Sequence, residues 1–216
     1  MKTRLFRGDN AVSPLVVLNT FEGEGGVVFD AVRFLTDSDF SLLEVSGMDW
    51  NRDLSPWEAP PVFRNDAPFG GKADEFLAYL VNDAITCAVA ELGCRPVFVA
   101  IAGYSLAGLF AVYSLYRTDV FFAAVSASGS FWFPGFLEFA SSNEFKARTA
   151  GIYLSLGDTE ARTRNPVMAM VQDNTEKLAA LYRGKGIRTT YELNPGNHFR
   201  DPELRMAKGI CRILES

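Results

Sequence analysis

The chain has 216 residues, a length that fits one domain spanning residues 1–216. Apolar residues make up 48% and charged residues 22%, which is ordinary for a globular protein with a full core. The net charge of −5 and the lack of any basic run argue against nucleic-acid binding, and no apolar stretch is long enough to predict a membrane span. We therefore expect a globular protein that binds neither nucleic acid nor a membrane.

Strands and helices are predicted to alternate along the chain. Short apolar runs that end in polar or turn residues predict strands, and longer periodic segments predict helices. The strands are expected at 3–7, 14–20, 41–46, 96–102, 122–128, 152–156 and 189–193, and the helices at 73–92, 105–116, 167–185 and 202–214. This alternation predicts an α/β fold with a mostly parallel central sheet and helices on both of its faces.

One long irregular segment interrupts this alternation, at residues 51–71. It is rich in Pro, Gly and Asp, and it exceeds the length of about 15 residues above which a loop is usually functional or disordered. Because Trp50, Trp57 and Phe69 lie in or beside it, we expect an ordered loop at the functional site.

A nucleophile-elbow pattern lies at residues 103–108, Gly-Tyr-Ser-Leu-Ala-Gly, between a predicted apolar strand and a predicted apolar helix. Such an elbow needs small residues two positions before and two positions after its serine, because the chain turns sharply there. Gly103 meets the first requirement, and Ala107 stands where glycine is usual. The pattern predicts Ser105 as a nucleophile; the alternative is a serine that caps a buried helix.

The base would be His198, which is the only histidine of the chain and follows the elbow in sequence. Asp158 and Glu160 lie between them, which gives the order serine, acid, histidine of the α/β-hydrolase triad. Asp158 could cap the turn with its short side chain, whereas Glu160 has the longer reach, so we favour Glu160 as the acid. Asp158 as the acid, a Ser105–His198 dyad, and a histidine that merely packs in a turn stay open.

An oxyanion intermediate needs two N–H donors. The N–H of Leu106 would begin a helix, where amide donors lack acceptors and the helix dipole favours negative charge. The second donor is expected from the loop after the second strand, at Thr20 or Phe21. The alternative for this loop is a plain polar turn.

Aromatic residues are candidates to line a substrate pocket, although packing beneath the loops is an equally open use for them. The candidates are Trp57, Phe131, Trp132 and Phe133, together with Tyr104 beside the predicted nucleophile.

No metal or cofactor is expected. Asp158 and Glu160 form a carboxylate pair, but no second cluster completes a metal site around them. The three cysteines, Cys87, Cys94 and Cys211, are odd in number and unpatterned in spacing. Free thiols fit a reducing compartment better than a disulfide framework does, and we expect a cytoplasmic protein.

Four segments resemble the bacterial esterase family that is related to esterase D and to the siderophore esterases, within the α/β-hydrolase superfamily. They are residues 103–108, 155–160, 163–168 and 194–199, and the similarity extends from about Pro14 to the end of the chain. The resemblance implies an α/β-hydrolase fold with Ser105 as nucleophile, His198 as base and Glu160 as acid, three residues after a strand-end glycine. Residues 129–150 are too few for a large lid domain.

The predicted function is therefore a serine carboxylic-ester hydrolase that acts on a small ester through an acyl-enzyme. An acyltransferase or a thioesterase would use the same triad. A non-catalytic binding protein that keeps the α/β-hydrolase fold is the alternative from a different functional class.

Overall fold

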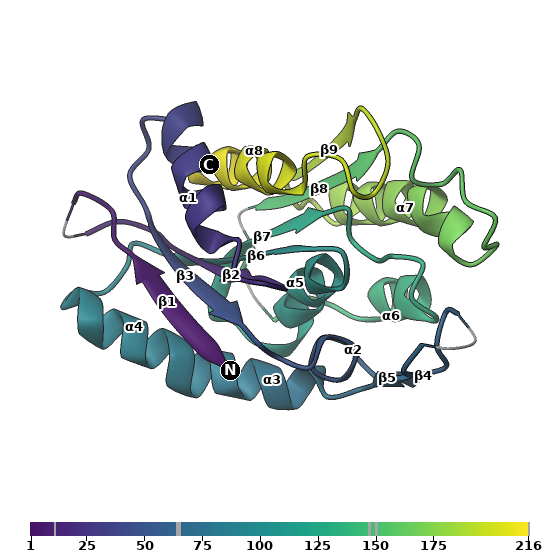
Figure 1. Cartoon of the computed structure of the whole chain (residues 1–216), viewed down its shortest axis with the longest axis horizontal. Helices are drawn as coiled ribbons and strands as arrows, with labels where there is room; N and C mark the ends of the chain where they lie inside the picture. Colours follow the sequence, from purple (N-terminus) through teal and green to yellow (C-terminus); the bar gives the residue numbers. More distant parts are fainter. Residues whose placement is uncertain (11, 64–65, 147, 150, 216) are drawn as a thin grey trace.

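A seven-stranded sheet forms the centre of the protein (Figure 1), in the strand order β1-β3-β2-β6-β7-β8-β9. The computed structural model describes residues 1–10, 12–63, 66–146, 148–149 and 151–215. Its strands are β1 (Lys2–Phe6), β2 (Leu15–Asn19), β3 (Ser41–Ser46), β6 (Val99–Tyr104), β7 (Phe121–Ala127), β8 (Gly151–Gly157) and β9 (Thr189–Asn194). Strand β1 is antiparallel to β3, and the other neighbouring strands are parallel, which confirms the mostly parallel sheet.

Helices cover both faces of this sheet. On one face lie α1 (Gly25–Leu35) and α8 (Pro202–Leu214), which pack on each other and on the sheet. On the other face lie α3 (Ala73–Tyr79), α4 (Ile85–Leu92), α5 (Leu106–Arg117), α6 (Phe136–Ser142) and α7 (Val171–Gly184). Figure 1 shows α1 and α8 above the sheet and α3 and α4 below it. The predicted helices on both faces are thus confirmed.

The predicted elements all form. The strand at 41–46 and the helices at 73–92 and 202–214 have the predicted ends, and the others are shifted at one end or both. The helix expected at 73–92 contains a π-helical turn at Leu80–Ala84, between α3 and α4. The helix expected at 167–185 begins with a 3₁₀ turn at Met168–Met170 and continues as α7. The helix after the elbow is buried from Leu106 to Tyr116, as its uniformly apolar sequence predicts.

Besides the four-residue α2 (Trp50–Asp53), two helices were not predicted from the sequence. Helix α1 starts with two glycines, which are poor helix formers, and it is held by the burial of Val28, Phe29 and Val32 against the sheet. Helix α6 has seven residues and buries Phe136 and Ala140. In both helices tertiary packing outweighs a weak local preference.

The long segment 51–71 has short ordered elements. They are α2 (Trp50–Asp53) and the antiparallel pair β4 (Glu58–Ala59) and β5 (Phe69–Gly70). Between β7 and β8, the described residues hold only the seven-residue α6, in keeping with the expectation of no large lid. Within the described ranges, no helix has the length and apolarity needed to cross a membrane.

Parallel pairing brings the carboxyl ends of the strands to one edge. In the register, Gly103 of β6 faces Asn19 of β2 on one side and Ser126 of β7 on the other, and Gly157 of β8 faces Asn194 of β9. The loops that follow these strands therefore meet at the carboxyl edge, where open α/β sheets bind their ligands.

Candidate active site

Ser105 lies in the sharp turn between β6 and α5. Its φ of 56° and ψ of −122° fall in a region that residues with side chains rarely adopt. A Cβ atom on Gly103 would lie 2.4 Å from the carbonyl oxygen of Ala107, so the position two before the serine has to be glycine. Ala107 itself is fully buried, and the elbow thus accommodates one methyl group two positions after the serine.

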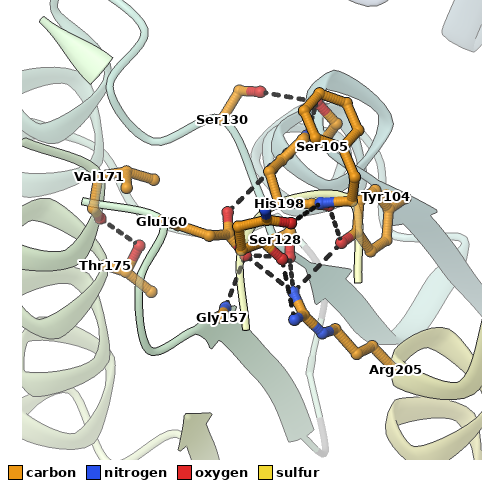
Figure 2. Close-up of polar contacts among 12 residues, drawn as sticks. Tyr104, Ser105, Ser128, Ser130, Gly157, Glu160, Val171, Thr175, His198 and Arg205 are labelled. Carbon is orange, nitrogen blue, oxygen red and sulfur yellow. Dashed lines mark hydrogen bonds and ion pairs between the residues drawn. The ribbon is translucent and has the colours of Figure 1, made fainter. Parts of the chain in front are cut away.

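The side chains of Ser105, His198 and Glu160 form a continuous chain of contacts (Figure 2). His198 Nε2 lies 3.2 Å from Ser105 Oγ, and His198 Nδ1 lies 2.9 Å from Glu160 Oε2. Asp158 does not contact the imidazole; its Oδ1 accepts a 2.9 Å hydrogen bond from the N–H of Gly196. Of the two acids expected from the sequence, Glu160 is therefore the one that contacts His198, while Asp158 supports the loop that carries the histidine.

The carboxylate of Glu160 is buried, with 4% of its side chain exposed. Its Oε1 accepts hydrogen bonds from Ser128 Oγ and the N–H of Gly157, both at 2.6 Å, and from Arg205 Nη1 at 2.9 Å. Burial by itself raises the pKa of this carboxyl, but the hydrogen bonds from His198, Ser128 and Gly157 outweigh it, so the pKa is lowered. The site thus favours the ionised form that can orient an imidazole.

Arg205 of α8 is a buried cation behind the carboxylate, with 2% of its side chain exposed. Besides Glu160 it contacts Ser128 Oγ at 3.0 Å, and its Nη2 donates to the carbonyls of Pro195 and Asn197 at 3.2 and 3.0 Å. One guanidinium therefore joins the acid to the loop that carries the histidine. Sequence reasoning missed this residue; the available signal was a charge among the buried positions of an amphipathic helix.

Tyr104 links the elbow to the same network. Its hydroxyl donates a 2.6 Å hydrogen bond to the backbone carbonyl of His198 and lies 3.3 Å from Arg205 Nη1. Tyr104 also lines a cavity beside Ser105, as was expected of it.

Two further serines at the end of β7 were also missed. Ser130 Oγ lies 3.3 Å from Ser105 Oγ, and Ser128 is the partner of Glu160 and Arg205 described above. The run of small polar residues after an apolar strand, at the edge where the other site residues gather, was the signal for them.

The candidate oxyanion donors differ in availability. The N–H of Leu106 is the first of α5 and has no intrahelical acceptor. The N–H of Thr20 donates to the carbonyl of Val45 at 2.9 Å, so Thr20 is not available as a donor, contrary to one of our expectations. The N–H of Phe21 has no acceptor among the described residues, which leaves Phe21 as the candidate in this loop.

Two cavities adjoin Ser105, and Trp50 lines both of them. The first has a volume of about 280 Å³, and His198 and Phe21 line it. The second has a volume of about 170 Å³, and Leu106 and Trp132 line it. An ester carbonyl at Ser105 could therefore extend a group to either side.

Three of the aromatic residues expected in a substrate pocket lie elsewhere. Phe131 and Phe133 are 1% and 2% exposed and belong to the core beneath the loop after β7. The indole N–H of Trp57 donates to the carbonyl of Pro134, and its ring packs on Phe133. We therefore correct the expectation for Trp57, Phe131 and Phe133. Trp132 lines one of the two cavities at Ser105, whereas its neighbours Phe131 and Phe133 turn into the core.

Comparison with solved structures identifies the fold. The structure of an IroE-like serine hydrolase from Shewanella oneidensis superposes with a TM-score of 0.78 and 16% identity, over 99% of this chain and 75% of that one. The siderophore hydrolase EstA from Aspergillus nidulans superposes with a TM-score of 0.75 and 20% identity, over 96% and 84%. The chain has an α/β-hydrolase fold.

Other matches to this α/β-hydrolase chain are partial. The enterochelin esterase from Shigella flexneri gives a TM-score of 0.72 and 19% identity, over 98% of this chain but 54% of that one. The uncharacterised protein YbbA of Bacillus subtilis is 23% identical over 137 residues, which are 62% of this chain. The match covers 55% of the length of YbbA, which is about half of that relative. No protein-family model matches the chain.

Proposed function

We propose that this chain is a serine carboxylic-ester hydrolase. The observation that carries the proposal is the unbroken line of contacts from Ser105 Oγ through the imidazole of His198 to the carboxylate of Glu160, at 3.2 and 2.9 Å. A nucleophile, a base and a group that orients the base, within hydrogen-bond reach of one another, are the requirement for this chemistry. Solved structures of the same fold that are named as a siderophore hydrolase and an enterochelin esterase support the same reaction class.

In the proposed reaction, Ser105 Oγ attacks the ester carbonyl while His198 Nε2 takes its proton. The carboxylate of Glu160 stabilises the resulting imidazolium, and the N–H groups of Leu106 and Phe21 hold the oxyanion. The tetrahedral intermediate collapses as His198 returns the proton to the leaving alkoxide, which departs as the alcohol. Water then attacks the acyl-enzyme by the same steps and releases the acid.

We infer that the alcohol part and the acyl part of the ester bind in different cavities. His198 has to reach the leaving oxygen, so the alcohol part extends into the cavity that His198 lines, which we call the alcohol cavity. The acyl part extends toward Leu106 and Trp132, in the acyl cavity. Volumes of about 280 and 170 Å³ suit a small ester.

Labelling with a fluorophosphonate tests the nucleophile. We expect one covalent adduct by intact-protein mass spectrometry, absent in Ser105→Ala, and a loss of ester turnover of about 10⁴- to 10⁶-fold in that variant. Ser114→Ala is the matched control, because Ser114 is a buried serine of α5 remote from the cavities. Labelling of another serine, or full activity in Ser105→Ala, would refute the assignment.

A panel of oxygen esters, thioesters and acyl acceptors separates the hydrolase from a thioesterase or an acyltransferase with the same triad.

We also propose a cytoplasmic location, because three cysteines, an odd number, fit free thiols in a reducing compartment. Cell fractionation with an antibody to the protein tests the location.

A further inference from the structure

The alcohol cavity has aromatic walls. Trp50 and Tyr104 are half-buried in it, while Phe21 and Phe199 are 62% and 85% exposed at its rim. The ring of Phe21 meets that of Trp50 edge-on at 5.1 Å, and the ring of Phe199 meets that of His198 at 5.3 Å. Large rings left exposed around a nucleophile provide faces for a ligand rather than for the core.

The same cavity carries two carboxylates. Glu24 is fixed in place because its side chain accepts hydrogen bonds from the N–H groups of Glu22 and Gly23, both at 3.1 Å. Glu203 lies half-buried in the first turn of α8 and has no side-chain partner among the described residues. No lysine or arginine is among the described residues that line this cavity.

A buried amide is a second indication of a ligand site. Asn19, at the end of β2, lines the alcohol cavity and is 1% exposed, yet neither its Oδ1 nor its Nδ2 has a partner among the described residues. Buried amides in folded proteins are nearly always hydrogen-bonded, so this one points to a polar group of a ligand or to its water.

We propose that the alcohol cavity selects a substrate whose alcohol part carries an ammonium group. A cation over the faces of Trp50 and Tyr104 interacts with the ring quadrupole, and the carboxylates of Glu24 and Glu203 add direct attraction. The same carboxylates disfavour an anionic alcohol part, because no lysine or arginine among the described lining residues offsets the repulsion. As a statement about an ester substrate, this inference rests on the proposed hydrolase function.

Two acetate esters that differ only in charge test the selection. The ester of choline has a trimethylammonium group where the ester of 3,3-dimethylbutan-1-ol has a tert-butyl group of the same shape. We expect kcat/KM to be about tenfold higher for the cationic ester. Glu203→Gln should reduce this ratio by roughly threefold or more, whereas Glu22→Gln, an exposed carboxylate outside the cavity lining, should leave it unchanged. A ratio of one or less in the native protein overturns the proposal.

Calorimetry on Ser105→Ala makes the two proposals separable. Binding to this variant can be measured without turnover, and the ligands are the two free alcohols, choline and 3,3-dimethylbutan-1-ol. Tighter binding of choline than of 3,3-dimethylbutan-1-ol, weakened by Glu203→Gln, supports the ammonium site even if no ester is hydrolysed and the hydrolase proposal fails. Equal binding, or a preference for the neutral alcohol, refutes the ammonium site even if both esters are hydrolysed.

Discussion

Glu160 and Asp158 lie two residues apart, and their side chains contact different residues of the loop that carries the histidine. Glu160 turns back under the sheet edge to His198, whereas Asp158 reaches the N–H of Gly196. The sequence alone favoured Glu160 on reach, and the contacts agree with that choice. What the sequence could not supply was the reason for the bend, which lies in the hydrogen bonds that Ser128 and Gly157 give to the Glu160 carboxylate.

We predict that Glu160→Gln lowers ester turnover by roughly 10²- to 10⁴-fold, because an amide neither orients the imidazole correctly nor stabilises its charge. Asp158→Asn makes the same chemical change two residues away and keeps an oxygen that can accept from Gly196. It should therefore stay close to native turnover. Steady-state rates on one ester measure the turnover of both variants. A larger loss in Asp158→Asn than in Glu160→Gln would assign the role of the acid to Asp158.

The lowered pKa of Glu160 also predicts how stability depends on pH. Because the folded state favours the carboxylate, Glu160 stabilises the fold fully above its ordinary pKa of 4.5, and this contribution is lost as the pH falls through the lower folded-state value. The difference in unfolding free energy between the native protein and Glu160→Gln should therefore shrink below pH 4.5. Urea unfolding at a series of pH values measures it, and a difference that grows on acidification would contradict the assigned direction.

Arg205 gives a third prediction at the residue scale. Arg205→Met removes the cationic partner of a buried carboxylate and a donor to the carbonyls of Pro195 and Asn197, which should cost about 3–5 kcal/mol of unfolding free energy. Arg200→Met removes an arginine whose side chain is 70% exposed and pairs with Asp201, and it should cost about 1 kcal/mol or less. Urea unfolding of both variants measures these losses. Similar losses would show that the buried contacts of Arg205 contribute no more to stability than an exposed ion pair.

At the scale of elements, the end of β8 has to pass very close to the histidine loop. A Cβ atom on Gly157 would lie 2.2 Å from the carbonyl oxygen of Gly196 and 3.0 Å from that of Asn197. Glycine at this position is therefore required by the approach of two segments that are about forty residues apart in sequence.

We predict that Gly157→Ala displaces the histidine loop and lowers turnover by about 10²-fold, since a shift of about 1 Å at a catalytic group costs that much. The matched control is Gly184→Ala at the end of α7, where an added Cβ meets no atom within 4 Å. It should keep native turnover and gain up to about 1 kcal/mol of stability from helix propensity. Equal turnover in both variants would show that the loop tolerates the displacement.

The elements differ in how far the sequence predicts them. The strands and α5 follow from local apolar runs, and the elbow follows from residues adjacent in sequence. Helix α1 could not be predicted in the same way, because its glycines oppose a helix and only packing on the sheet holds it. Arg205 and the two carboxylates of the alcohol cavity, Glu24 and Glu203, were missed for a related reason, since their roles arise from segments that only the fold brings together.

At the scale of the whole molecule, one sheet is shared by two apolar clusters. Residues such as Val17 and Ile101 point into the cluster under α3 and α5, while Val16 and Ala100 point into the cluster under α1 and α8. Neither cluster can come apart without exposing strands that the other also covers. The two faces should therefore unfold together.

We predict a single cooperative unfolding transition, as expected of one domain. The tryptophans Trp50, Trp57 and Trp132 all pack against the cluster under α3 and α5, so their fluorescence reports that face alone. Circular dichroism reports the helices of both faces. The two signals should give the same urea midpoint, and separate midpoints would divide the chain into independent units.

The presence of one histidine has a consequence for spectroscopy. Histidine labelled with ¹⁵N in its ring gives a single pair of side-chain signals in this protein, and both belong to His198 without any assignment. Their chemical shifts distinguish the tautomers. The contact with the Glu160 carboxylate calls for a hydrogen on Nδ1, and the proposed attack by Ser105 needs a lone pair on Nε2. The atom that would transfer the proton can thus be observed directly, in the resting protein and in its acylated form.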